Sequence, residues 1–168
     1  MLEAANATSS LLMFHPGLMP GEAPPEPFAD TSILRASALN LQASLSHMGL
    51  TLIAGGFLDQ YPDITFQLVN LGGTLPFVLE RLEAVALSRP PHEAFPRAAL
   101  RRLVYDCASM GPLALELAVK VLGADRIMLG TDYPIFTPDQ ARDTVAAASL
   151  SEADRAMILS GTARRLLG

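Results

Sequence analysis

Four polar residues of this 168-residue chain each stand at the end of a short apolar run, a position that suits chemistry. A histidine or a carboxylate can bind a metal or transfer a proton, and an amide can donate and accept hydrogen bonds. Because the carboxyl ends of parallel strands meet at one edge of a sheet, we expect these side chains to face one pocket. The four residues are His15, Asn70, Asp106 and Asp132.

Turn formation is a competing explanation for some of these residues. Asn and Asp follow strands in many proteins because they favour turns, and this alone explains Asn70 and Asp106. His15 is not a favoured strand terminator, so it is either a functional group or a hydrogen-bonded structural residue. His15 and Asp132 could share a divalent cation such as zinc, but a catalytic zinc site usually has three protein ligands and a water.

We expect structural roles for the other histidines and the single cysteine. His47 lies among apolar residues of a predicted helix, and His92 lies in a proline-rich segment where we expect it at the surface. We expect Cys107 to be a small buried residue. One cysteine cannot form an intrachain disulfide, which agrees with a cytoplasmic location.

An α/β fold with parallel strands would bring the four polar residues together. Strands are predicted at 11–14, 64–69, 102–106 and 126–130, where apolar runs end in Gly, Pro, Asn or Asp. The stretches with helical spacing are Thr31 or Ser32 to about 48, 50–60, 75–87, 112–122, 138–147, 151–159 and 162–167. This alternation predicts one domain over residues 1–168 with right-handed crossovers.

Two proline-rich segments interrupt the alternation. Residues 16–30 contain five prolines and residues 88–96 contain three more. Proline lacks the backbone donor that helices and ladders need, so both segments are predicted to be loops.

Composition excludes several classes of protein. The formal net charge is −5, with no dense basic patch, so no nucleic-acid partner is expected. The mean hydropathy is +0.31, but no apolar run reaches the ~18 residues of a membrane-spanning helix, so no membrane partner is expected. The first residues carry no Lys or Arg, and thus lack the basic region of a secretory signal peptide.

Four strings resemble a known family of enzymes. They are LLMFHPG, GGFLDQYPDITFQLVNLGGTLPFVLERLE, LVYDCASMGPLALELAVKVLGADRIMLGTDYPIF and LSGTARRLLG. Their order and spacing over residues 8–168 are similar to the amidohydrolase-related, metal-dependent TIM barrels, a family that includes aminocarboxymuconate semialdehyde decarboxylase and γ-resorcylate decarboxylase. The resemblance implies a TIM-barrel fold and a divalent metal, zinc or alternatively manganese.

The resemblance also implies roles for single residues. His15 and Asp132 match metal ligands of the family, and Asp132 is in addition a candidate catalytic residue. Asn70 stands where the family usually has a histidine that hydrogen-bonds or protonates at the reacting centre. Arg81 matches an arginine that binds a substrate carboxylate in some decarboxylases, sometimes across a dimer interface. Asp106 matches a frequent polar residue with no assigned role.

The chain departs from the family pattern in two ways. It has no His-x-His pair, from which the family draws its other metal ligands, and only four βα units are visible, so we expect the C-terminal half of a barrel with an incomplete ligand set. Asn70 does not titrate near neutral pH and cannot act as a general acid or base. A truncated gene product, a separately encoded half and a wrongly assigned start would each explain the pattern.

Two main functional hypotheses follow. The first is a metal-dependent hydrolase or decarboxylase that acts on a small carboxylated aromatic or cyclic substrate. The second is a non-catalytic half-barrel that binds a partner half or regulates a full-length paralogue. A metal-free domain that binds a small ligand is a third. Since a half-barrel exposes strand edges and apolar surface, we also expect it to dimerise, to bind an N-terminal half-barrel or to aggregate.

Overall fold

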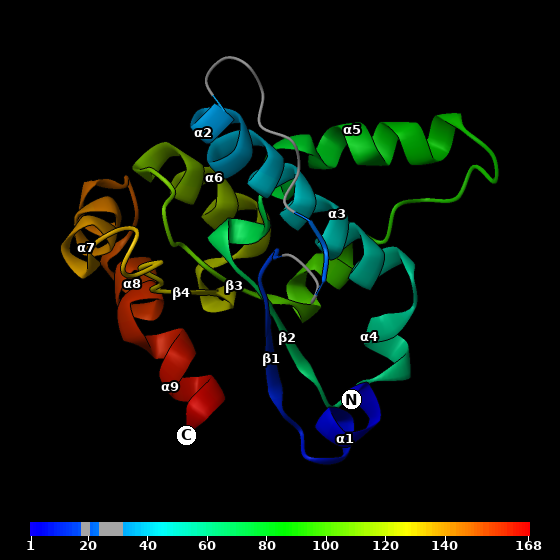
Figure 1. Cartoon of the computed structure of the whole chain (residues 1–168), viewed down its shortest axis with the longest axis horizontal. Helices are drawn as coiled ribbons and strands as arrows, with labels where there is room; N and C mark the ends of the chain where they lie inside the picture. Colours follow the sequence, from blue (N-terminus) through cyan, green and yellow to red (C-terminus); the bar gives the residue numbers. More distant parts are fainter. Residues whose placement is uncertain (18–20, 24–31) are drawn as a thin grey trace.

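The computed structural model describes residues 1–17, 21–23 and 32–168. Its centre is a parallel sheet of four strands in the order β1-β2-β3-β4 (Figure 1). The strands are β1 (Leu11–Phe14), β2 (Thr65–Leu68), β3 (Val104–Asp106) and β4 (Ile127–Met128). The predicted α/β class, with parallel strands in sequence order, is confirmed.

Three of the four strands are shorter than the sequence predicts. Short 3-10 helices lead into the third and fourth strands, η3 (Arg97–Arg102) and η4 (Ala124–Arg126). The Arg126 N–H donates to the Gly123 carbonyl oxygen at 3.1 Å, so this residue is held in a turn before it could pair. The predicted strands 102–106 and 126–130 therefore start too early and the fourth also ends too late, whereas the predicted end of the third strand at Asp106 is confirmed. The second strand is one residue shorter at each end than the predicted 64–69.

Helices connect the strands. They are α1 (Leu2–Ala7), α2 (Ser32–Leu34), η1 (Arg35–Asn40), α3 (Leu41–Ala54), α4 (Phe57–Gln60), η2 (Asn70–Gly72), α5 (Leu75–Ser88), α6 (Pro112–Leu122), α7 (Pro138–Ala147), α8 (Glu152–Ala156), η5 (Met157–Gly161) and α9 (Thr162–Leu167). The predicted bounds of α6, α7 and α9 are confirmed. The sequence did not predict α1, and the predicted break between residues 48 and 50 was wrong.

That break is absent because Gly49 is buried inside α3. A Cβ atom at this position would lie 2.4 Å from Cδ1 of Leu75, so a glycine allows α3 to approach α5 closely. In the predicted loop at 88–96 only Ser88, the last residue of α5, is helical, whereas most of the predicted loop at 16–30 lies outside the described residues.

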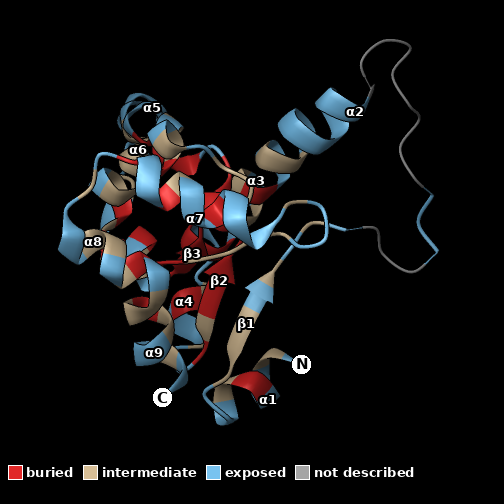
Figure 2. Cartoon of the chain, turned by 90° about the vertical axis from the view of Figure 1, so that its left-hand side faces the viewer, coloured by how far each residue is buried: buried red, intermediate tan, exposed pale blue. Residues whose placement is uncertain are grey.

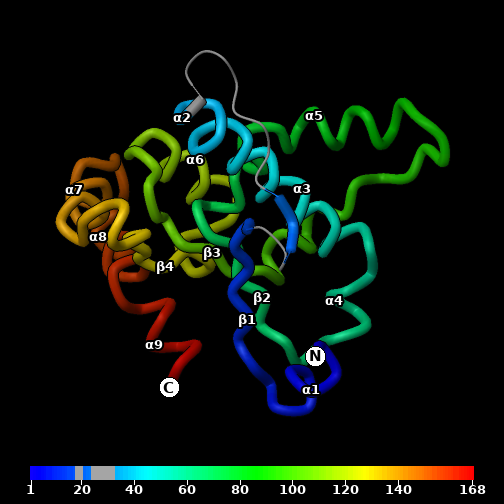
Figure 3. The backbone as a smooth tube through the Cα atoms, viewed as in Figure 1, coloured from blue at the N-terminus to red at the C-terminus, as the bar shows by residue number. Residues whose placement is uncertain are grey.

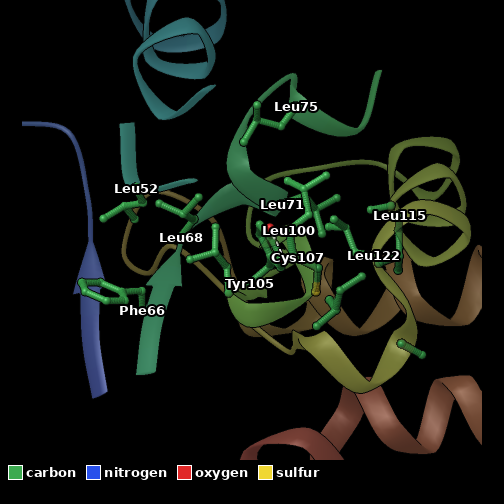
Figure 4. Packing of buried hydrophobic residues seen from close by; sticks show 14 of the residues in the cluster. Leu52, Phe66, Leu68, Leu71, Leu75, Leu100, Tyr105, Cys107, Leu115 and Leu122 are labelled. Carbon is green, nitrogen blue, oxygen red and sulfur yellow. Dashed lines mark hydrogen bonds between the residues drawn. The ribbon is translucent and has the colours of Figure 1, made fainter. Parts of the chain in front are cut away.

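The main core lies between the sheet and the helices that follow its strands. Figure 4 shows Leu68 of β2, Tyr105 of β3 and Leu115 of α6 packed within it, and each of these side chains is fully buried. The Tyr105 hydroxyl donates to the Leu100 carbonyl oxygen at 2.9 Å. Cys107 is buried in the same cluster, as predicted. Figure 2 shows the contrast between the buried β2 and β3 and the exposed α2.

In Figure 3, α1 lies at the amino end of β1, and α9 packs against β4. His47 and His92 are both exposed, the latter as predicted. No helix in the described ranges is long and apolar enough to cross a bilayer. The cytoplasmic location stays a prediction.

Candidate functional site

The carboxyl ends of the strands surround a cavity of about 520 Å³. His15 follows β1, Asn70 follows β2, Asp106 ends β3 and Asp132 lies in the loop after β4, and all four line this cavity. The structure thus brings together the four residues that the sequence singled out. The four strand ends meet there because the strands are parallel and lie side by side in one sheet.

Asp106 is the centre of the hydrogen bonds at this edge. Its Oδ1 accepts from the backbone N–H of Asn70 at 3.0 Å and of Ala108 at 3.1 Å, and its Oδ2 accepts from Nε2 of Gln67 at 2.9 Å. The residue is only 5% exposed. Burial raises the pKa of the Asp106 carboxyl above its usual range, the three hydrogen bonds oppose this rise, and the charge of Asp132 adds to it.

The loops around the cavity have unusual backbone conformations. Asn70, Ser109 and Asp132 have φ values of 52°, 55° and 54°, in the left-handed region that few non-glycine residues adopt. Such conformations cost about 1–3 kcal/mol each and cluster at functional sites. Here they occur in the loops after β2, β3 and β4, and two of the three residues, Asn70 and Asp132, line the cavity.

Asn70 is almost fully buried, at 1% exposure. Its Nδ2 donates to the Ser109 hydroxyl at 2.5 Å, while its backbone is held by Asp106. The side-chain Oδ1 therefore stays available as an acceptor. The left-handed φ of Asn70 and the bond from the Gly73 N–H to its carbonyl oxygen fit the turn explanation, and the contacts with Ser109 and Asp106 occur in addition to it.

His15 and Asp132 present different polar groups to the cavity. The His15 ring is exposed and its Nδ1 lies 2.6 Å from the Pro16 carbonyl oxygen. Because a carbonyl oxygen can only accept, this contact assigns a proton to Nδ1, which leaves Nε2 as the ring atom that could bind a metal. The Asp132 side chain is partly buried and accepts no hydrogen bond from any described residue.

The residues present do not fit a complete metal centre. Within residues 1–17, 21–23 and 32–168, no group of three His, Cys, Asp or Glu side chains is placed to hold an ion. His15 and Asp132 offer two ligands of the right chemistry, and a catalytic site usually needs three protein ligands. The metal ligands named from the sequence therefore stay a prediction.

Arg81 lies apart from the other predicted site residues. It is exposed on α5 and does not line the cavity. Sequence reasoning also missed Gln67 and Ser109, whose side chains hold Asp106 and Asn70. Gln67 carried one signal, because it is a polar residue between the apolar Phe66 and Leu68 in the buried part of its strand.

The chain is similar to known proteins in sequence and in fold. The sequence profile described as "Amidohydrolase" matches residues 1–168. The chain belongs to the amidohydrolase family. This confirms the family resemblance, and the four βα units are part of the TIM barrel that the family implies.

Amidohydrolase relatives extend well beyond this chain. This chain is 32% identical over 128 residues to the γ-resorcylate decarboxylase of Rhizobium sp. (strain MTP-10005). The aligned region covers 70% of this chain and 38% of the relative. A 2,6-dihydroxybenzoate decarboxylase structure from Rhizobium superposes with a TM-score of 0.74 at 23% identity, over 98% of this chain and 53% of that one. The chain thus spans about 38% of the length of two γ-resorcylate decarboxylases that it matches.

A further solved structure carries a metal. The dihydroxybenzoic acid decarboxylase of Polaromonas sp. JS666, with bound manganese and the inhibitor 2-nitroresorcinol, has a TM-score of 0.75 at 23% identity, over 98% of this chain and 51% of that one. At this level of identity the likeness establishes a shared fold.

Proposed function

We propose that this chain carries part of the active site of a decarboxylase for small carboxylated aromatic acids. The observation that carries the proposal is the cavity at the carboxyl edge, where His15, Asn70, Asp106 and Asp132 converge. Relatives named as decarboxylases favour this reaction over the hydrolysis that the sequence left open.

The residues of the chain have distinct proposed roles. In the overall reaction the bond between the ring and the carboxyl carbon breaks, carbon dioxide leaves and the ring carbon gains a proton. We assign Asp132 as the acid–base group, because its carboxylate lines the cavity without a hydrogen bond from the described residues. The free Oδ1 of Asn70 would accept a hydrogen bond from a ring hydroxyl and orient the ring.

Two further assignments rest on family position. His15 and Asp132 are the proposed metal ligands of this chain, with manganese, which a relative holds, as the first cation to test and zinc as the second. Arg81 is proposed to bind the substrate carboxylate. Because it is exposed and outside the cavity of its own chain, it would have to act on a site in a neighbouring molecule.

The assay is conversion of 2,6-dihydroxybenzoate to 1,3-dihydroxybenzene, followed by liquid chromatography with and without Mn²⁺. Because one copy supplies only two metal ligands, we expect turnover once a second copy or an N-terminal half-barrel completes the set. We expect its loss in Asp132→Asn and no effect of Asp139→Asn, which changes an exposed carboxylate on α7. Absence of turnover by such a folded assembly with either metal would contradict the proposal.

The second candidate is the non-catalytic half-barrel. The specific observation in its favour is that His15 and Asp132 have no third ligand beside them among the described residues. A folded chain without turnover, which nevertheless binds a protein partner, would support this candidate.

A further inference from the structure

A second, smaller cavity adjoins the main one at the carboxyl edge of the sheet. Its volume is about 230 Å³, and Thr131 lines both cavities. The walls of this side pocket come from the loops after β3 and β4 and from α7, which packs beside α6 (Figure 1). The lining residues are Ser109, Met110, Gly111, Thr131, Phe136, Gln140, Ala141 and Thr144.

Hydrogen bonds within the chain hold the walls of the side pocket in place. The Thr144 hydroxyl donates to the Met110 carbonyl oxygen at 3.3 Å, which ties α7 to the loop after β3. The Ser109 hydroxyl accepts from Nδ2 of Asn70 at 2.5 Å, which joins the same loop to a residue of the main cavity. Such contacts fix the shape of the pocket in advance, as in most sites for small molecules.

The size and lining of the side pocket suit one substituent of a ligand. Ligand sites are usually about 300–1,000 Å³; the main cavity, at about 520 Å³, falls in this range and the side pocket does not. Met110, Phe136 and Ala141 give it apolar walls, and none of the described residues that line it is charged. It therefore suits an uncharged group on a ring that occupies the main cavity.

The polar groups of the side pocket are mainly hydrogen-bond donors. Oε1 of Gln140 accepts from the N–H and the hydroxyl of Thr137 at 2.8 and 3.2 Å, so Nε2 is the group left to bind a ligand. The Thr131 hydroxyl accepts from the Tyr133 N–H at 3.3 Å, and Ser109 likewise accepts one bond, so each keeps its proton to donate. In the part of the chain that the structure describes, no residue accepts from these three donors. A ligand oxygen would satisfy them.

We propose that the side pocket binds an uncharged substituent with an acceptor oxygen, a methoxy or carbonyl group, on the ring of the aromatic acid. The identity of the ring rests on the proposed function. Gln140 and Thr131 would donate to the substituent oxygen, and Met110 and Phe136 would contact its carbon atoms. The chain would then bind ring acids that carry such a group more tightly than acids that lack it.

Methionine methyl groups report on the two cavities separately. Met128 lines the main cavity and Met110 lines the side pocket. The 168-residue chain is labelled with ¹³C at its methionine methyl groups and titrated with ring acids by NMR. The probes are 2,6-dihydroxybenzoate, its 3-methoxy and 4-methoxy derivatives, and the matching ethyl derivatives. An ethyl group has the size of a methoxy group but lacks the acceptor oxygen.

The expected shifts differ between the probes. All of the acids should shift the Met128 methyl signal, and only substituted acids should shift that of Met110. A methoxy acid should bind about fivefold more tightly than its ethyl counterpart, which is the factor that one hydrogen bond of ordinary net strength gives. A Met110 signal that no methoxy acid moves, or equal affinities within both methoxy–ethyl pairs, would overturn the proposal.

A matched pair of variants assigns the preference to Gln140. Gln140→Glu keeps an acceptor for Thr137, and thus the capping box of α7, but replaces the amide donor with an acceptor. It should abolish the preference for methoxy over ethyl. Gln60→Glu, the same change at an exposed position on α4 outside both cavities, should retain the preference. Circular dichroism checks that both variants are folded.

Two results would separate the side pocket from the proposed function. A full methoxy preference in folded Gln140→Glu, or a shift of Met128 without Met110, would overturn the side pocket and leave the decarboxylase proposal standing. Because binding is measured here without turnover, failure of the decarboxylase assay would be a distinct result.

Discussion

Substitution of Asp106 separates the hydrogen-bonding role of this carboxylate from its charge. In Asp106→Ala the N–H groups of Asn70 and Ala108 and the Nε2 of Gln67 lose their acceptor inside the protein. A buried donor left unsatisfied costs about 1–3 kcal/mol, so three of them cost about 3–9 kcal/mol. This is comparable to the about 5–15 kcal/mol by which a typical domain is stable.

Asp106→Asn should lower the free energy of unfolding much less than Asp106→Ala, for a geometric reason. Both backbone donors bind Oδ1, and an asparagine can keep that oxygen in place. Its Nδ2 would then face Gln67, whose amide can rotate by half a turn and present Oε1 as an acceptor. We expect a loss of about 1 kcal/mol, since a charge-assisted bond becomes neutral while the cost of burying a charge disappears.

Urea unfolding followed by circular dichroism measures these differences, with Asp139→Asn as an exposed control expected to match the wild type. The reasoning is refuted if Asp106→Ala lies within about 1 kcal/mol of the wild type, a margin below the cost of one orphaned donor, or if the two Asp106 variants are equally unstable.

The pH dependence of stability has a definite sign at this site. Because burial raises the pKa of Asp106 in the folded state, the folded protein binds the proton more tightly than the unfolded chain does. The contribution of Asp106 to the free energy of unfolding therefore falls as the pH rises from the unfolded pKa, about 3.9, through the raised folded pKa. Asp106→Asn should remove this fall, and an unchanged pH profile in that variant would contradict the assignment.

Three other substitutions probe the fold around the site, and urea unfolding measures each. Gly130→Ala should lower the free energy of unfolding by about 1–3 kcal/mol through overpacking, because the new Cβ would lie 2.7 Å from the Cβ of Asp106. An unchanged free energy of unfolding would show that the loop moves aside without cost. Leu115→Ala should cost about 2–5 kcal/mol, since the side chain is fully buried, and a loss below 1 kcal/mol would place it outside the core. Thr137→Ala should cost about 0.5–2 kcal/mol by removing the capping box formed with Gln140, so an unchanged midpoint would argue against that cap.

Much of the fold was predictable because its signals are local. The first strand was predicted with its observed bounds, and so were α6 and α7, since an apolar run or a helical period is read from neighbouring residues. The polar residue at each strand end could be found in the same way. The strand starts near 102 and 126 could not, because 3-10 turns there compete with strand pairing.

The amino-acid sequence by itself determined the parallel α/β order, the family and the identity of the four polar residues at the strand ends. Only the tertiary structure decided what those residues contact. Asp106 binds Gln67 and Asn70 across separations of 39 and 36 residues, and Asn70 binds Ser109 across 39. Such contacts depend on how strands and loops pack in space, and no local periodicity encodes them. The separation of Arg81 from the cavity has the same origin, because helix orientation is fixed by packing against the sheet.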